Sequence, residues 1–389
     1  MNTAAAPETV VSLPPEPGTH VTVRGLCKSF AGAPLYTNFN LDLPRAGSPG
    51  SGLASPRVLN LVPPPPERKS PLAEGIEKSA KPDCRKAYSG MGPLAVGTDG
   101  AGSVRIPAAF CGNVGLKPSF GRVPAYPLSP FGTVAHLGPH TMSVRDAALM
   151  MNVLKQPDAR DWHALPPDGD DYLQHLERGI RGLKIAYSPA LGYAQDIHPE
   201  VAAAVQAAVR QLQDLGAHVE QLDPGIEDPL PISIGLWFAG AWAIWNALTP
   251  AQQALADPDF ATEAEAGSKY GVLELHRLTL ARGALGAHMR QFMQRVDLLV
   301  TPAVAVPAFD ARPAGSVPLT PQNMLGWTPF SYPFNLTQQP ACTIPCGLTR
   351  DGLPIGLQIV GPMFGDALVL RAARAYETLR PIPRPALDF

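Results

Sequence analysis

A glycine-rich turn that ends on a serine carries the clearest chemistry in this chain of 389 residues. The apolar residues 93–96 lead into Gly97-Thr98-Asp99-Gly100-Ala101-Gly102-Ser103. Glycines permit positive φ angles and let another group approach the backbone closely. Successive N–H groups in such a turn can converge on an anion. The turn is therefore either a structural or phosphate-binding loop, or a serine nucleophile beside an oxyanion hole.

The spacing of the glycines argues against the phosphate-binding alternative. The turn matches neither G-x-x-x-x-G-K-[ST] nor G-x-G-x-x-G, the two common phosphate-binding motifs. A serine nucleophile whose oxyanion is held by backbone N–H groups is the more specific interpretation.

The residues around the turn resemble a known family. The stretch 97–107, followed by 110–112 and 115–124, closely resembles the second half of the amidase signature. Enzymes of that family hydrolyse or transfer amides with a serine, cis-serine, lysine triad. Including the later segments, the resemblance covers about residues 89–385.

The resemblance implies a role for each residue of the turn and requires no cofactor. Ser103 corresponds to the acyl-accepting nucleophile, and Asp99 and Arg105 correspond to a pair that braces the loop. The oxyanion hole is assigned to the backbone N–H groups of Gly100, Ala101, Gly102 and Ser103.

The upstream half of the signature departs from the family pattern. Family members carry Gly-Gly-Ser-Ser-Gly-Gly there, whereas residues 67–88 are polar and charged. Ser79 falls near the cis-serine position by spacing alone, and coincidence explains it as well. The family lysine belongs several dozen residues earlier. Lys78 and Lys81 are candidate substitutes for this lysine, and the alternative is that both are solvated surface charges. Lys117 is structural in the family motif.

The N-terminal residues resemble a different family from the rest of the chain. Residues 21–44 resemble the opening strands of an ABC-type ATPase, but no phosphate loop follows, so ATP hydrolysis is excluded. We expect residues 1–66 to form this fragment with a Pro/Gly-rich linker, and residues 67–389 to form an amidase-like domain. The N-terminal part of its core would then be missing or replaced.

The rest of the chain alternates helices and strands, which predicts an α/β fold. Helices are expected at 143–154, 198–215, 272–295 and 366–379. Strands are expected at 183–187, 217–222, 297–300 and 355–360. The strand–helix–strand unit within 183–222 favours a parallel or mixed sheet wrapped by helices, as the resemblance implies.

The net charge and the cysteines limit which partners, metal sites and cellular location are expected. A net charge of −2 gives no electrostatic case for binding nucleic acid. Five cysteines without a framework spacing favour reduced thiols and a cytoplasmic location. Cys342 and Cys346 lack a second Cys/His pair, so we expect core packing and no metal site. The partners expected are a small-molecule amide and, as one oligomeric form, a homodimer.

One apolar stretch, 231–250, is about long enough to span a membrane. Its glycines, its asparagine and a proline at each end favour a buried helix or the wall of an apolar pocket, so no membrane association is expected. Its aromatic residues, together with Trp327, either line an acyl pocket or pack in the core.

Two hypotheses for function remain. The first is an amidase-family hydrolase that cleaves a carboxylic amide through an acyl-enzyme on Ser103. The alternative is a catalytically impaired or inactive amidase-like protein, formed by fusion or truncation, that lacks the cis-serine motif and the catalytic lysine.

Overall fold

The computed structural model describes residues 21–30, 33–43, 94–310 and 322–382. The chain divides into two units, Met1–Asn60 and Leu61–Phe389. The predicted boundary between residues 66 and 67 lies outside the described residues and stays a prediction.

The first unit contains an antiparallel strand pair. Strand β1 (Val21–Phe30) pairs with β2 (Ala33–Leu43), and the register runs from Val21 opposite Leu43 to Phe30 opposite Ala33. Strands were expected within residues 21–44, and both lie there.

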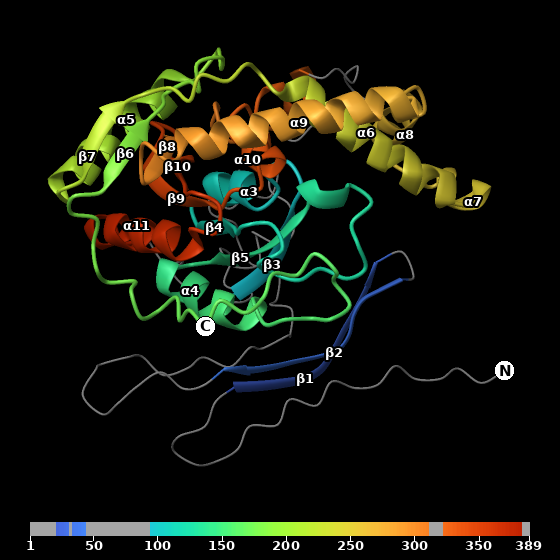
Figure 1. Cartoon of the computed structure of the whole chain (residues 1–389), viewed down its shortest axis with the longest axis horizontal. Helices are drawn as coiled ribbons and strands as arrows, with labels where there is room; N and C mark the ends of the chain where they lie inside the picture. The colour runs from blue at the N-terminus through green and yellow to red at the C-terminus, as the bar shows by residue number, and fades with distance from the viewer. Residues whose placement is uncertain (1–20, 31–32, 44–93, 311–321, 383–389) are drawn as a thin grey trace. The chain divides into compact units, whose positions relative to one another are not determined.

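The second unit is built on a mixed sheet of eight strands in the order β3-β5-β4-β9-β10-β8-β6-β7 (Figure 1). The first six form antiparallel pairs, whereas β8, β6 and β7 run parallel. The strands are β3 (Leu94–Asp99), β4 (Val114–Lys117), β5 (His136–Thr141), β6 (Lys184–Tyr187), β7 (His218–Gln221), β8 (Leu298–Pro302), β9 (Ala341–Leu348) and β10 (Pro354–Val360).

Helices cover both faces of this sheet. Those described are α3 (Arg105–Cys111), α4 (Val144–Leu154), α5 (Pro199–Asp214), α6 (Leu230–Ala247), α7 (Pro250–Gln253), α8 (Pro258–Gly267), α9 (Val272–Phe292), α10 (Tyr332–Leu336) and α11 (Asp366–Leu379), with short turns η1 (Gly132–Val134) and η2 (Gln322–Gly326). Helices α4, α5 and α11 pack on one face, and α3, α9 and α10 lie on the other (Figure 1).

The strands place alternate side chains on these two faces. Leu298 and Val300 of β8 belong to the core beneath α4, α5 and α11, whereas Leu299 between them contacts the α9–α10 side. Ile185 and Ala186 of β6 divide in the same way. This period of two is expected for a sheet that is buried on both faces.

The mixed α/β fold predicted from the sequence is confirmed, and each of the four helices and four strands expected after residue 142 is present. Ser143 caps α4, its hydroxyl accepting a hydrogen bond from the Asp146 amide, and β6, α5 and β7 form the predicted parallel unit. Strands β4, β5 and β9 were not predicted. Whether part of the core is replaced concerns residues that the structure does not describe.

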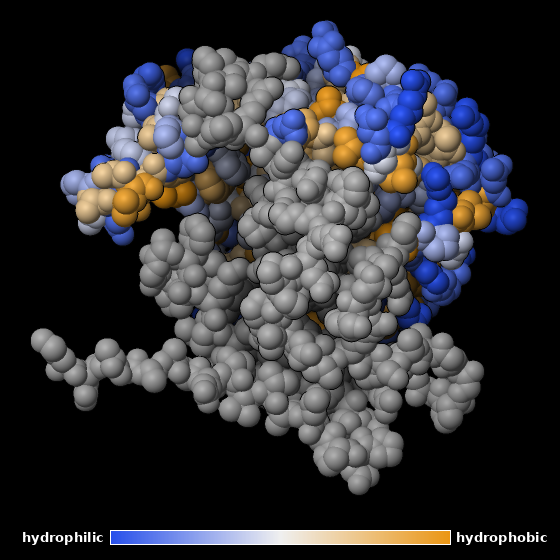
Figure 2. All heavy atoms as spheres, turned by 180° about the vertical axis from the view of Figure 1, so that it is seen from behind, coloured by the Kyte–Doolittle hydropathy of each residue, from blue (hydrophilic) through white to orange (hydrophobic). Residues whose placement is uncertain are grey.

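Helix α6 is less buried than the sequence suggested. It packs against α8, α9 and α10, yet only 39% of its most apolar window is buried. Of the helices described, it is the one whose length and composition would allow a membrane span. Figure 2 shows apolar side chains on the projecting end that α6 and α7 form. Leu255 and Trp242 are among the exposed large apolar residues.

Candidate active site

The turn that carries Ser103 connects the end of β3 to the start of α3. Gly102 has a φ of +127°, a backbone conformation that favours glycine. A Cβ atom at this residue would lie 2.5 Å from Cδ1 of Ile106 and 2.6 Å from Oγ of Ser331. The tight path of the turn therefore requires glycine immediately before the serine.

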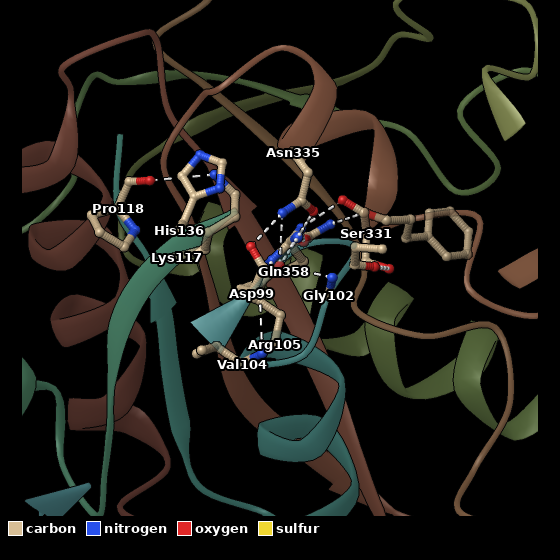
Figure 3. Close-up of polar contacts among 12 residues, drawn as sticks. Asp99, Gly102, Val104, Arg105, Lys117, Pro118, His136, Ser331, Asn335 and Gln358 are labelled. Carbon is tan, nitrogen blue, oxygen red and sulfur yellow. Dashed lines mark hydrogen bonds and ion pairs between the residues drawn. The ribbon is translucent and has the colours of Figure 1, made fainter. Parts of the chain in front are cut away.

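The buried carboxylate of Asp99 holds the turn from within (Figure 3). The amide of Gly102 donates to Oδ1 of Asp99 at 2.7 Å, and the amide of Val104 donates to Oδ2 at 3.3 Å. These bonds tie the residues on either side of Ser103 to the end of β3.

Arg105 lies beside Asp99 and is also fully buried. Its Nε and Nη2 donate to the two carboxylate oxygens of Asp99, each at 3.0 Å. Its other N–H groups donate to Ser331 O at 2.9 Å, Gln358 Oε1 at 2.8 Å and Asn335 Oδ1 at 2.5 Å. A guanidinium has five N–H donors, so each donor has an acceptor.

Asn335 completes this buried cluster. Its side-chain amide donates to Asp99 Oδ1 at 2.9 Å, to Asp99 O at 2.8 Å and to Val134 O at 3.0 Å. Burial alone would raise the pKa of Asp99, but Arg105 and the hydrogen bonds hold that pKa well below its usual range. The carboxylate therefore stays ionised beneath the turn.

This arrangement changes the oxyanion hole inferred from the sequence. Because the Gly102 amide already donates to Asp99, it is directed into the loop rather than toward a substrate. Among the described residues, no group accepts a hydrogen bond from the amides of Gly100 or Ala101. Gly100, Ala101 and Ser103 remain as the proposed donors, and Ser103 itself is half-buried.

Lys117, on β4, is fully buried but belongs to another part of the network. Its amine donates to the carbonyls of Pro118 and Gln339. Figure 3 shows it beside Pro118 and His136, across Asp99 from Gly102. Burial and the nearby Arg105 charge lower the pKa of Lys117 well below its ordinary value.

The lowered pKa of Lys117 predicts a pH dependence of stability. Between its lowered folded pKa and the unfolded value of about 10.4, the unfolded chain binds the additional proton, so stability rises with pH. The free energy of unfolding should rise relative to Lys117→Met by up to about 1.4 kcal/mol per pH unit. Urea unfolding from about pH 8 to about pH 10 measures this difference; parallel pH profiles would show that Lys117 stays protonated when folded.

Residues 89–370 match the family model named Amidase. The chain belongs to the amidase signature family. It is 36% identical to an acylamidase of Rhodococcus erythropolis over 301 residues, which cover 75% of this chain and 62% of that protein. It is 32% identical to a glutamyl-tRNA(Gln) amidotransferase subunit of Myxococcus xanthus, over 93% of this chain and 77% of that one.

Solved structures of the amidase signature family share the fold. A bacterial aryl acylamidase of the family superposes with a TM-score of 0.69 at 30% identity, over 77% of this chain and 64% of that one. A 6-aminohexanoate cyclic dimer hydrolase superposes with a TM-score of 0.71 at 26% identity, over 78% and 68%. The chain thus spans about three fifths of the length of the acylamidase.

The remaining predicted site residues are not described by the structure, and the turn has partners that the sequence did not indicate. Ser79, Lys78 and Lys81 lie outside the described residues, so their roles stay predictions. His136 is buried, and its Nδ1 lies 2.8 Å from Val134 O. Ser331 and Asn335 were not identified from sequence, because no local pattern links them to a turn some 230 residues away.

Cys342 and Cys346 lie in β9 and belong to the core beneath α4, α5 and α11. Burial raises the pKa of the Cys346 thiol to about 12, so it is protonated at neutral pH. Both residues pack as the sequence analysis expected.

The aromatic residues predicted for an acyl pocket separate in the structure. Trp237 and Phe238 of α6 belong to an apolar cluster with Ala101 and Tyr332, next to the turn. Trp327 belongs to a different cluster, where its ring stacks on Phe110 with centroids 6.0 Å apart. Trp237 and Phe238 are thus the aromatic residues of this set that share a cluster with a residue of the turn, Ala101.

Proposed function

We propose that this chain hydrolyses carboxylic amides through a serine acyl-enzyme, with Ser103 as the nucleophile. The observation that carries the proposal is the braced turn, in which Asp99 and Arg105 fix the backbone on both sides of Ser103. Membership of the amidase signature family supports the same reaction.

The proposed reaction has two halves. The Oγ atom of Ser103 adds to the amide carbonyl, and its proton passes to the proton relay to which the cis-serine belongs. The amides of Gly100, Ala101 and Ser103 hold the oxyanion. The C–N bond then breaks and the amine leaves with a proton. Water adds to the resulting ester, which releases the carboxylic acid and restores the serine. We propose Ser79 for the cis-serine of the relay.

Two measurements on the unmodified chain test this function. Amine release from simple aliphatic and aryl amides measures turnover, and a fluorophosphonate reagent labels an activated serine through a new O–P bond with loss of fluoride. We expect turnover together with a label that peptide mapping places on Ser103. Absence of both would favour the catalytically impaired alternative.

The surroundings of Trp237 suggest which amides would bind. An atom placed at the Cβ position of Gly100 would lie 2.9 Å from Cζ3 of Trp237, so the indole packs directly against the turn. Its ring stacks on Phe131 with centroids 4.0 Å apart, and its Nε1 donates to Oε2 of Glu263 at 3.0 Å. We propose that an apolar or aryl group of the substrate contacts this fixed indole.

Replacing Trp237 with alanine should lower kcat/KM selectively for aryl amides. Loss of about 80 Å² of apolar contact corresponds to about 2 kcal/mol, or roughly a thirtyfold fall in kcat/KM for an aryl amide. An amide with only a methyl group on its carbonyl and an unsubstituted nitrogen should be far less affected. Steady-state kinetics of the two substrates measure the split.

Glu263→Gln provides the matched control for Trp237→Ala. Glutamine retains an oxygen acceptor for the indole N–H, so aryl-amide kinetics should stay close to those of the unmodified chain. An equal fall in kcat/KM for both substrates in Trp237→Ala would show that the indole supports the turn rather than selecting the amide.

A further inference from the structure

Ser331 contacts the nucleophile turn from the segment that leads into α10. It is fully buried, and its Oγ lies 2.8 Å from Ala101 O and 3.1 Å from Thr328 O. A hydroxyl has one proton to donate. Ala101 O is the nearer of the two acceptors, so the hydroxyl proton is directed to it.

The bond from Ser331 acts on one particular peptide unit. The carbonyl of Ala101 and the amide of Gly102 belong to the same planar group. Ser331 holds the oxygen end of this group, and Asp99 accepts the N–H at the other end at 2.7 Å. Rotation of this peptide is therefore opposed at both ends, and the amides of Ala101 and Ser103 lie on either side of it.

Ser331 is also joined to the charged cluster beneath the turn. Its backbone carbonyl accepts a hydrogen bond from Nη1 of Arg105 at 2.9 Å. The hydroxyl is thus carried by a residue whose backbone is itself fixed by the buried ion pair.

We infer that Ser331 is a positioning residue that sets the orientation of the oxyanion-hole amides by fixing the Ala101–Gly102 peptide. This inference rests on the proposed function for its effect on catalysis, although the fixing of the peptide does not. Removing the hydroxyl leaves the Ala101 carbonyl without this donor and lets the peptide rotate.

The test compares Ser331→Ala with Thr328→Val. Thr328 is equally buried, and its hydroxyl donates to Leu325 O at 2.8 Å, so the control loses a buried hydroxyl in the same segment. Hydrogen–deuterium exchange of a peptide covering residues 97–105 reports the turn directly. We expect Ser331→Ala to exchange about tenfold faster there, and Thr328→Val to match the unmodified chain.

Kinetics on an amide substrate give the second readout. Ser331→Ala should lower kcat about tenfold with little change in KM, because the oxyanion forms only after binding. Unchanged exchange in Ser331→Ala, or equal acceleration in both variants, would overturn the inference. The exchange result tests the role of Ser331 even in a chain without turnover. Failure of the proposed function appears instead as absent turnover and absent labelling in the unmodified chain.

Discussion

Replacing Ser103 with alanine is expected to lower kcat for amide hydrolysis by about a millionfold, because loss of the nucleophile removes the acyl-enzyme pathway altogether. The substitution deletes one oxygen from a half-buried side chain, so the fold should remain intact. Amine release over long incubations measures the loss, and thermal unfolding of both chains verifies that they are folded.

Two further comparisons sharpen the Ser103 prediction. Ser79→Ala should also lower kcat if Ser79 relays the proton, while Ser103 remains present for the fluorophosphonate reagent. Turnover that survives in Ser103→Ala would place the nucleophile elsewhere in the chain.

Replacing Arg105 with methionine is expected to destabilise the second unit by about 3–5 kcal/mol, since it leaves the buried Asp99 carboxylate without its counter-charge. Ser331 O, Gln358 Oε1 and Asn335 Oδ1 would also lose their donor. Because domains are stable by only about 5–15 kcal/mol, so large a loss should be plain in urea unfolding.

A double variant distinguishes this mechanism from a loss of packing. Asp99→Asn combined with Arg105→Met removes both charges while asparagine can still accept the Gly102 amide. The double variant should therefore be more stable than Arg105→Met alone. An additive or greater loss would mean that the ion pair is not the source of the destabilisation.

Local sequence signals predict most of the elements in the second unit. The spacing of apolar residues and the Ser143 cap locate α4, and Pro199 with Gly216 brackets α5. Strand β9 gives no such signal, because Pro345 interrupts it and cannot donate to a ladder. Its place in the middle of the sheet is a tertiary property.

The candidate site divides in the same way. Ser103, the turn and the Asp99–Arg105 pair lie within seven residues, so a motif can predict them together. The direction of the Gly102 amide cannot be read from a motif, because the Asp99 carboxylate and Ser331, far along the chain, fix the peptides around it. A short stretch of sequence therefore determines which residue types form the site, whereas contacts far along the chain determine how the backbone amides of the turn are oriented.

The long-range ties of Arg105 have a consequence for biosynthesis. Three of its acceptors follow it by 226, 230 and 253 residues. Translation proceeds from the N-terminus, and contacts distant in sequence form only after the chain between them has been made and closed into a loop. The nucleophile turn is thus synthesised early but assembled late, after β10 has emerged from the ribosome. An unfinished chain therefore carries Ser103 in a turn that Arg105 and its distant acceptors do not yet brace.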